Sequence, residues 1–218
     1  MNGYAFTLAG AELTALPSGA LWWGAQRLLC VSDLHLGKAE RAARRALSAL
    51  PPYETRDTLA RLEAEVDRHA PAMVICLGDS FDDDAAARAL SEQDRIWIAR
   101  LQAGRRWCWL EGNHDTGPVD LGGEHLAELT LGPLTFRHIA EAGAVGEVSG
   151  HYHPKAGVRG GPSRPCFLLD AARLILPAFG TYTGGLRVRD PALAGLMAPG
   201  ALAILTGAEA RPIPMPRD

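Results

Sequence analysis

Short apolar runs alternate with stretches of helical periodicity in the first half of the chain. Three runs have strand length and are almost wholly apolar: residues 28–31, 73–77 and 106–110. The stretches between them space their apolar residues as helices do, which predicts helices over residues 38–50, 54–69 and 84–101. Strands that alternate with helices build β-α-β units, so we expect an α/β fold with a mostly parallel sheet.

The second half has a different pattern, because its apolar runs follow one another with glycine or proline turns between them. These runs lie at residues 129–131, 134–136, 145–148, 167–169 and 174–176. The second half is therefore expected to be β-rich and partly antiparallel. The proline-rich end cannot continue a helix or a central strand, so we expect a loose tail from about residue 208 on a single domain spanning residues 1–218.

Composition and charge narrow the class of protein without choosing a substrate. The 218 residues are 47% hydrophobic and 22% charged, which is ordinary for a globular α/β domain with a sizeable core. The net charge of −3 gives no global attraction to nucleic acid, so a polyanion needs a local basic patch or bound cations. The cysteines lack C-x-x-C spacing and are expected to be buried free thiols: Cys30, Cys76, Cys108 and Cys166.

The chain carries no basic leader followed by an apolar segment, and no apolar stretch approaches the length that spans a bilayer. We therefore expect a cytoplasmic protein without a membrane partner. Trp22 and Trp23 can form a homodimer interface if they are exposed, although core burial explains them more simply.

Four polar stretches each follow an apolar run and carry side chains that bind hard or borderline metals. They are residues 33–35, 78–82, 112–115 and 150–153. Asp, Asn and Gly also form turns after strands, so each stretch alone is weak evidence. Four of them at strand ends that share a sheet predict a common metal site. Oxygen and imidazole donors without thiolate favour Mn²⁺, Fe or catalytic Zn²⁺, and Asp79 is the candidate bridge between two ions.

The ordered motifs D-x-H, G-D-x-x-D, G-N-H-D, a lone His and G-H-x-H resemble the signature of the calcineurin-like metallophosphoesterase superfamily. The resemblance implies a metallophosphoesterase-type αββα sandwich, in which mixed β-sheets are flanked by helices. It also implies two divalent metal ions that share Asp79. The other ligands of one ion would be Asp33, His35 and His153; those of the second would be Asn113, His138 and His151. His114 would be the catalytic imidazole, protonating the leaving oxygen while a metal-bridging hydroxide attacks phosphorus.

Several of these residues also have simpler explanations. His138 can merely close the strand at residues 134–136. Asp82 and Asp115 can cap a following helix, or they can orient metal ligands or His114 from behind. Asp83 is better explained as the acidic start of the next helix, where a negative charge suits the dipole.

A closer resemblance covers roughly residues 5–206. It is carried by D-L-H-L-G-K at residues 33–38 with the arginines that follow, by H-Y-H-P at 151–154, and by L-P-A-F-G at 176–180 leading to T-G-G. These stretches look like the ligase-associated DNA damage response endonuclease PdeM family. The resemblance implies a manganese-dependent phosphodiesterase that cuts DNA in repair, with a DNA ligase and a helicase as functional associates. The motifs also lack the arginines of Ser/Thr protein phosphatases, which favours a diester.

Candidates for substrate contacts flank the metal motifs. Lys38, Arg41 and Arg45 are spaced to share a helix face and can meet DNA phosphates, or they can form a solvated surface. Tyr152 can stack on a base or shield the metals. Residues 155–164 carry three basic side chains and can form a substrate loop or an ordinary hairpin.

Three functions therefore stay open. A DNA phosphodiesterase or endonuclease is favoured by the flanking residues. A hydrolase of small molecules, such as a cyclic nucleotide or a nucleotide-sugar pyrophosphate, is the first alternative. A non-catalytic interaction scaffold is the second, and it needs none of the charges that the motifs would bury.

Overall fold

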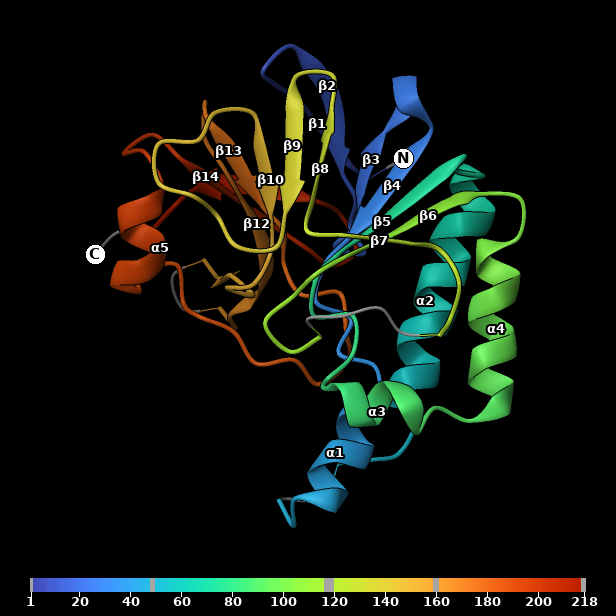
Figure 1. Ribbon diagram of the computed structural model, residues 1–218. Coiled ribbons are helices and arrows are strands. Elements are labelled where there is room, and N and C mark those ends of the chain that lie inside the picture. Colours follow the sequence, from blue (N-terminus) through green and yellow to red (C-terminus); the bar gives the residue numbers. More distant parts are fainter. Residues whose placement is uncertain (1, 48–49, 116–119, 159–160, 217–218) are drawn as a thin grey trace.

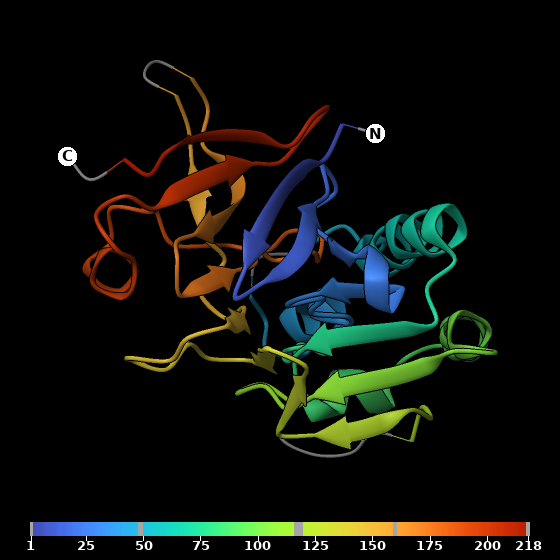
Figure 2. The ribbon, with the colours of Figure 1, turned by 90° about the horizontal axis from the view of Figure 1, so that it is seen from above.

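The molecule consists of two β-sheets that face each other, with helices on the outer face of each. This arrangement is visible in a computed structural model that describes residues 2–47, 50–115, 120–158 and 161–216. The two sheets form the middle layers, α2 and α4 cover one side, and α5 covers the other (Figure 1, Figure 2). The predicted α/β class and αββα sandwich are therefore confirmed.

The first sheet places the predicted parallel strands side by side. In the described part of the chain it has seven strands in sequence order: β1 (Tyr4–Leu8), β2 (Ala11–Ala15), β3 (Leu21–Trp23), β4 (Leu28–Val31), β5 (Met73–Leu77), β6 (Arg106–Leu110) and β7 (Glu124–Leu126). Strands β1 to β4 pair antiparallel, whereas β4 to β7 pair parallel. The central strands are continuously apolar because both of their faces are covered.

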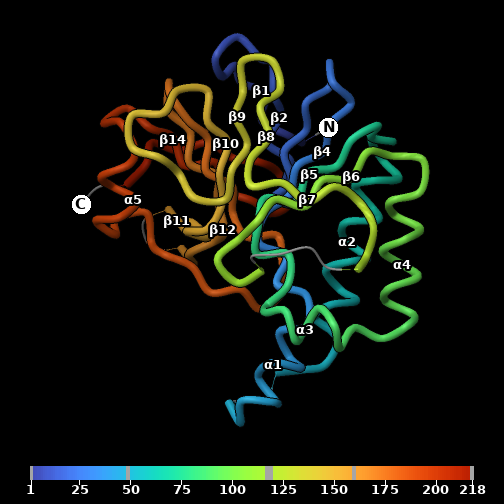
Figure 3. Tube along the Cα trace, in the orientation of Figure 1, coloured from blue at the N-terminus to red at the C-terminus, as the bar shows by residue number. Residues whose placement is uncertain are grey.

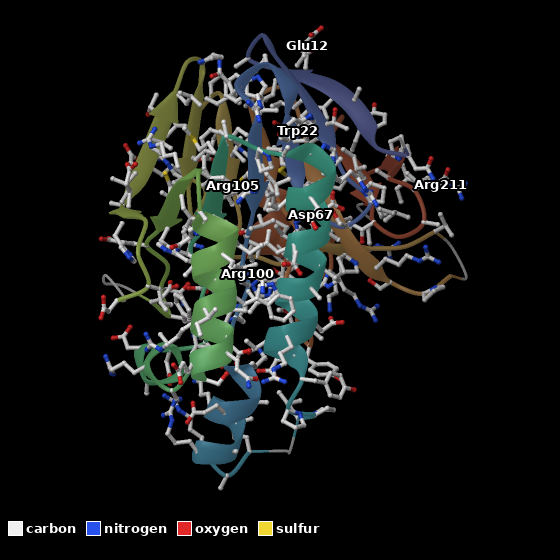
Figure 4. The ribbon with its side chains drawn as sticks, turned by 90° about the vertical axis from the view of Figure 1, so that its right-hand side faces the viewer. Glu12, Trp22, Asp67, Arg100, Arg105 and Arg211 are labelled. Atoms are coloured by element: carbon white, nitrogen blue, oxygen red, sulfur yellow. The ribbon has the colours of Figure 1, made fainter. Side chains whose placement is uncertain are left out.

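Helices make the crossovers of the first sheet. They are α1 (Lys38–Arg44), α2 (Glu54–His69), α3 (Asp84–Arg88) and α4 (Glu92–Gln102), and a short 3-10 helix, η1 (Gly24–Gln26), precedes β4. The predicted helix over residues 54–69 matches α2 residue for residue. Helices α2 and α4 lie side by side across the outer face of the sheet (Figure 4).

Two of the predicted helices are shorter than expected. The helix predicted over residues 38–50 ends at Arg44, and residues 48–49 lie outside the described ranges. The helix predicted over residues 84–101 is divided into α3 and α4, because the Ser91 side chain caps a new helix by accepting from the Asp94 N–H. As a result Ile96 is 53% exposed, whereas Ile98 faces the core.

The second sheet is β-rich and partly antiparallel, as predicted. Its described strands run in the order β15-β14-β12-β13-β10-β9-β8, and β11 pairs with β12. Their bounds are β8 (Glu128–Leu131), β9 (Leu134–Arg137), β10 (Glu147–Ser149), β11 (Lys155–Ala156), β12 (Arg164–Leu169), β13 (Arg173–Ile175), β14 (Leu202–Leu205) and β15 (Arg211–Pro214). The strand expected at 145–148 begins two residues later, and Val145 is 73% exposed. Helix α5 (Pro191–Leu196) was not predicted.

The expectation of a loose tail from about residue 208 is wrong for the described residues, which extend to residue 216. Residues 211–214 form β15, which pairs antiparallel with β14 at the edge of the second sheet, and Met215 is buried. An edge strand tolerates proline, because the missing N–H can face solvent rather than a neighbouring strand.

Apolar side chains fill the layers between these elements. One described cluster lies between the sheets and includes Phe136, a second joins the first sheet to α2 and α4 through Leu59, and a third packs α5 on the second sheet through Leu193. All four cysteines are buried and free, as predicted. Trp22 and Trp23 pack against the core clusters, which supports the simpler of their two explanations. No helix in the described ranges is long and apolar enough to cross a membrane.

Candidate metal centre

The carboxyl ends of β4, β5 and β6 meet at one edge of the first sheet, and the first three motifs follow them. The loops after β4 and β5 continue to pair beyond the strands: His35 N–H donates to the Asp79 carbonyl at 2.9 Å, and Leu36 N–H donates to the Ser80 carbonyl at 2.9 Å. Asp115 fastens the third loop to the second, because its Oδ2 accepts from the N–H groups of Ser80 (2.7 Å) and Phe81 (3.1 Å).

The second sheet supplies the other predicted ligands. His138 follows β9, whereas His151 and His153 follow β10, so the fourth motif does not share a sheet with the first three. The expectation that all four preceding strands share one sheet is therefore wrong. The facing packing of the two sheets brings the strand ends together instead, and the His151 N–H donates to Asp33 Oδ2 across the seam at 3.0 Å.

Two glycines allow this close approach. A Cβ at Gly150 would overlap the Ser32 hydroxyl, and a Cβ at Gly78 would overlap the His138 ring. Gly78 also has φ +69°, a conformation that favours glycine over other residues. The glycines of the G-D and G-H motifs therefore serve the approach of the two sheets.

Five of the predicted ligands have left-handed backbone conformations. Their φ angles are 54° at Asp33, 46° at His35, 46° at Asp79, 69° at His151 and 47° at His153. Such residues cost about 1–3 kcal/mol each and persist where the surroundings hold them, commonly at functional sites. Here these conformations occur in the loops whose ligand side chains meet between the two sheets.

The first cluster consists of Asp33, His35 and His153, whose ligand atoms all lie within 4.8 Å of one another. The Nε2 atoms of His35 and His153 are 3.4 Å apart, and Asp33 Oδ1 lies 3.1 Å from His153 Nε2. Asp33 Oδ1 is buried without a hydrogen bond of normal geometry. On the outer side, Asp82 Oδ1 lies 3.0 Å from His35 Nδ1, which orients the ring so that Nε2 faces the cluster.

The second cluster consists of Asp79, His138 and His151, again within 4.8 Å of one another. His138 Nδ1 donates to the Leu77 carbonyl at 2.9 Å, which leaves Nε2 free to face the cluster. That Nε2 lies 3.4 Å from Asp79 Oδ2, 3.2 Å from His151 Nδ1 and 3.1 Å from Asn113 Oδ1. The structure thus brings all seven predicted ligands together, and the bridging role of Asp79 stays a prediction.

These residues fit divalent cations. Each cluster aims carboxylate oxygens and imidazole nitrogens at one small space, and the buried Asp33 Oδ1 makes no hydrogen bond of normal geometry that would compete with a cation. Burial alone would lower the pKa of His138, but hydrogen bonding and charge from Asp79 outweigh it and raise that pKa to about 9. Burial alone would raise the pKa of Asp79, and hydrogen bonding with His138 lowers it to about 2. Both shifts arise from attraction between the Asp79 carboxylate and a positive charge beside it, and a divalent cation would satisfy the same attraction.

His114 lies beside both clusters and forms a third group of potential metal ligands with His35 and Asp82, whose ligand atoms also lie within 4.8 Å of one another. Its backbone N–H donates to Asp79 Oδ1 at 2.9 Å, and its Nδ1 donates to the Asp82 carbonyl at 2.9 Å. The second bond fixes the ring and leaves Nε2 available to a bound molecule. The ring also contacts His35 edge to face at 5.3 Å between centroids.

The side chains of Asp82 and Asp115 do not cap helices: Asp82 contacts the predicted ligand His35, and Asp115 accepts hydrogen bonds from the loop after β5. Asp83, not Asp82, caps α3 by accepting from the Ala86 N–H at 2.8 Å, as expected for that residue. Burial, together with the charge of Asp79, raises the pKa of Asp115 to about 7.

The basic residues of α1 are paired with carboxylates. Lys38 Nζ lies 3.5 Å and Arg41 2.9 Å from Asp82, while Arg45 lies 3.8 Å from Asp83. Tyr152 packs its ring on His151 at 4.9 Å and on the core beneath α5. The stretch at 155–164 forms the β11–β12 hairpin, the second of its two explanations, and residues 159–160 lie outside the described ranges.

Sequence reasoning missed two supports of the centre. The Ser32 hydroxyl donates to Asp33 Oδ2 at 2.5 Å, and its place just before D-x-H was the available signal. The segment after β13 packs on the first motif: Phe179 N–H donates to the Ser32 carbonyl at 2.8 Å, and Gly180 N–H donates to the Asp33 carbonyl at 3.1 Å.

Comparisons with known proteins agree with this geometry. A profile of the calcineurin-like phosphoesterase family matches residues 26–162, which hold every predicted ligand. The crystal structure of the Pseudomonas putida nuclease MPE is similar with a TM-score of 0.79 and 28% sequence identity, over 97% of this chain and 100% of that one. No curated protein matches the chain. A match over more than half of the chain, together with clusters of metal-binding side chains at the sheet edge, shows that the chain belongs to the calcineurin-like phosphoesterase family.

Proposed function

We propose that this phosphoesterase is a two-metal phosphodiesterase that cuts DNA. The observation that carries the proposal is the pair of Asp/His clusters at one seam, with the His114 ring beside them and its Nδ1 bound to the Asp82 carbonyl. When bound there, two divalent cations would lower the pKa of water and neutralise charge on the phosphoryl oxygens. Asp33, His35 and His153 would hold one ion, Asn113, His138 and His151 the other, and Asp79 would serve both.

His114 provides the proton in this proposal. Its imidazolium keeps Nδ1–H on the Asp82 carbonyl, so that Nε2–H points outward. As hydroxide, formed when water releases a proton to solvent, attacks phosphorus and the P–O bond to the leaving group breaks, that oxygen takes the proton from Nε2, and the neutral His114 regains a proton from solvent. Asp82 supports both groups at once, since its side chain orients His35 and its carbonyl orients His114.

Three features support DNA as the substrate and manganese as the metal. The similar solved structure is a nuclease, and the similarity covers nearly the whole of both chains. Donors are oxygen and imidazole nitrogen without thiolate, which suits Mn²⁺. The motifs that resemble the PdeM family support endonuclease action in repair, in the cytoplasm and alongside a DNA ligase and a helicase.

The experiment measures cleavage of circular single-stranded DNA, duplex DNA and bis(p-nitrophenyl) phosphate with added Mn²⁺. His114→Ala should lower kcat about 100-fold or more with its metal content unchanged, because a general acid contributes about 10²–10⁴. Asp79→Asn should lose both metal and activity. His125→Ala, on β7 and outside both clusters, is the matched histidine control.

Different failures have different meanings. Fewer than two ions per folded chain would contradict the two-metal centre. Turnover of the small diester without any cleavage of DNA would contradict the substrate and favour a small-molecule phosphodiesterase. Loss of metal in His114→Ala would contradict its role in proton transfer.

A further inference from the structure

Residues 180–190 border the metal centre along one flank. The segment begins where the Gly180 N–H binds the Asp33 carbonyl, and it passes Tyr152, whose carbonyl accepts from the Leu186 N–H at 3.1 Å. It therefore runs past loops from both sheets that carry predicted ligands. Its course follows the lower edge of the molecule from beside α3 to α5, drawn in orange (Figure 1, Figure 3).

The segment presents alternate side chains to the core and to solvent. It pairs with β11, because the Lys155 N–H donates to the Leu186 carbonyl at 2.8 Å and the Val188 N–H donates to the Lys155 carbonyl at 3.1 Å. Leu186 and Val188 pack into the cluster beneath α5. Arg187 and Arg189 consequently point the other way and are exposed.

These two arginines carry unneutralised charge. Among the described residues, neither has a carboxylate within ion-pair distance. The neighbouring Asp190 accepts from the Ala192 N–H, which caps α5. With Lys155, whose Nζ donates to the Thr183 carbonyl at 3.1 Å, they line a groove of about 720 Å³. One of its lining residues, Lys155, follows the predicted ligand His153 by two positions in the chain.

An exposed aromatic pair lies on the same segment. The ring of Tyr182 is 6.0 Å from the ring of Tyr53, which precedes α2, and the two residues are 39% and 55% exposed. Asp57, which lies near the pair, is already engaged by the Thr181 hydroxyl and by Arg61. Large aromatic side chains at the surface offer flat faces on which unpaired bases stack.

We infer that Tyr53, Tyr182, Arg187 and Arg189 form a binding strip for one strand of DNA beside the metal centre. The arginines hold backbone phosphates in the groove, and the tyrosine pair stacks an unpaired base. The inference rests on the proposed function. It identifies the side of the metal centre along which the DNA strand lies beyond the cleaved phosphate. Cations and exposed aromatic rings on one segment bind strands through phosphate charge and base faces rather than through sequence.

The test compares DNA with a substrate too small to reach the strip. The double variant Arg187→Ala/Arg189→Ala and the variants Tyr182→Ala and Tyr182→Phe are assayed with Mn²⁺ on single-stranded DNA and on bis(p-nitrophenyl) phosphate. The arginine variant should raise KM for DNA about tenfold and lower the salt slope by about 1 per arginine. Tyr182→Ala should raise that KM about fivefold or more, whereas Tyr182→Phe should not, because it keeps the ring.

Turnover of bis(p-nitrophenyl) phosphate should be unchanged in all of these variants. Arg211→Ala, an exposed arginine on β15, is the matched control and should leave KM for DNA unchanged (Figure 4). Wild-type cleavage of DNA with unaltered KM in the arginine variant would overturn the strip while leaving the proposed function standing. A wild-type protein that turns over the small diester and neither binds nor cuts DNA would overturn both.

Discussion

Two basic flanks border the metal centre, and they differ in what surrounds their positive charge. On one flank α1 carries Lys38, Arg41 and Arg44 and is followed by Arg45, and each of the four has Asp82 or Asp83 within 4 Å. On the other flank Arg187 and Arg189 have no such partner among the described residues. The flank richer in cations therefore offers less free charge to a polyanion.

The difference shows that basic residues near a metal site can neutralise the protein's own carboxylates rather than bind a substrate. Asp82 is buried, and hydrogen bonds from His35 and Arg41 overcome the effect of burial to hold its pKa below the usual range. It can therefore orient His35 as a carboxylate while α1 neutralises its charge. The α1 flank is best understood as a support of the first cluster.

The largest expected effect follows from removing that support. Asp82→Asn keeps the volume but loses the charge that Lys38 and Arg41 neutralise, so two cations would face His35 without compensation. Metal affinity should fall about 10–100-fold. Metal titration followed by activity measures this, and excess Mn²⁺ should partly restore turnover. Asp84→Asn, exposed on α3, is the control, and equal losses in both variants would contradict the role of Asp82.

A second variant should make the two flanks alike. Asp83→Asn keeps the helix cap but removes the carboxylate that pairs with Arg44 and Arg45, which frees Arg45 and leaves Arg44 with Glu40 alone. DNA affinity should then rise severalfold at low salt, and the salt slope should steepen by about 1 for each further phosphate that the released arginines neutralise. Fluorescence anisotropy at several salt concentrations measures both. Unchanged affinity would show that the α1 flank lies outside the path of the strand.

The flanks should also differ in their contributions to folding. Arg41→Ala leaves a buried oxygen of Asp82 with fewer partners and should lower the free energy of unfolding by about 1–3 kcal/mol. Arg187→Ala removes an exposed side chain and should change it by less than about 0.5 kcal/mol. Urea denaturation of the metal-free proteins separates the two. Similar losses would mean that Arg187 has a structural partner after all.

The smallest effect concerns pH. Burial alone would raise the pKa of Asp83, but hydrogen bonds from Arg44 lower it. A carboxylate with a lowered folded pKa adds stability above its unfolded pKa of about 3.9, and that stability is lost as pH falls through the folded value. The melting temperatures of wild type and Asp83→Asn should therefore differ at pH 7 and converge in acid. A constant difference across this range would contradict the linkage.

The predictable part of the molecule is the part that local pattern governs. The bounds of the strand over 73–77 and of the helix over 54–69 were predicted correctly. A buried strand is a continuous apolar run and an amphipathic helix spaces its apolar residues at helical intervals, so both patterns are visible in the sequence. Every ligand predicted from the motifs lies in one centre. The prediction of which sheet carries His151 and His153 was wrong, because they follow a strand of the second sheet. Which sheet a short strand joins depends on distant packing that no local pattern records.

The two flanks were beyond the reach of sequence for a similar reason. The spacing of Lys38, Arg41 and Arg45 predicted one helix face, of which Lys38 and Arg41 lie on α1 and Arg45 just beyond its end, but Asp83 meets these residues from 38 or more positions away along the chain. Arg187 and Arg189 were not predicted to contact substrate, because their alternation with Leu186 and Val188 spans too few residues to predict a strand. The edge strand β15 was missed because its prolines indicated a coil.

The division of the centre between two sheets has a consequence for biosynthesis. A ribosome delivers roughly 5–20 residues per second from the N-terminus, so Asp33, His35, Asp79 and Asn113 emerge well before any of the three histidines of the second sheet. Chains that stop before residue 151 lack ligands of both proposed ions. Copies truncated before that residue therefore cannot assemble the proposed metal centre, which requires that the second sheet has been made and docked.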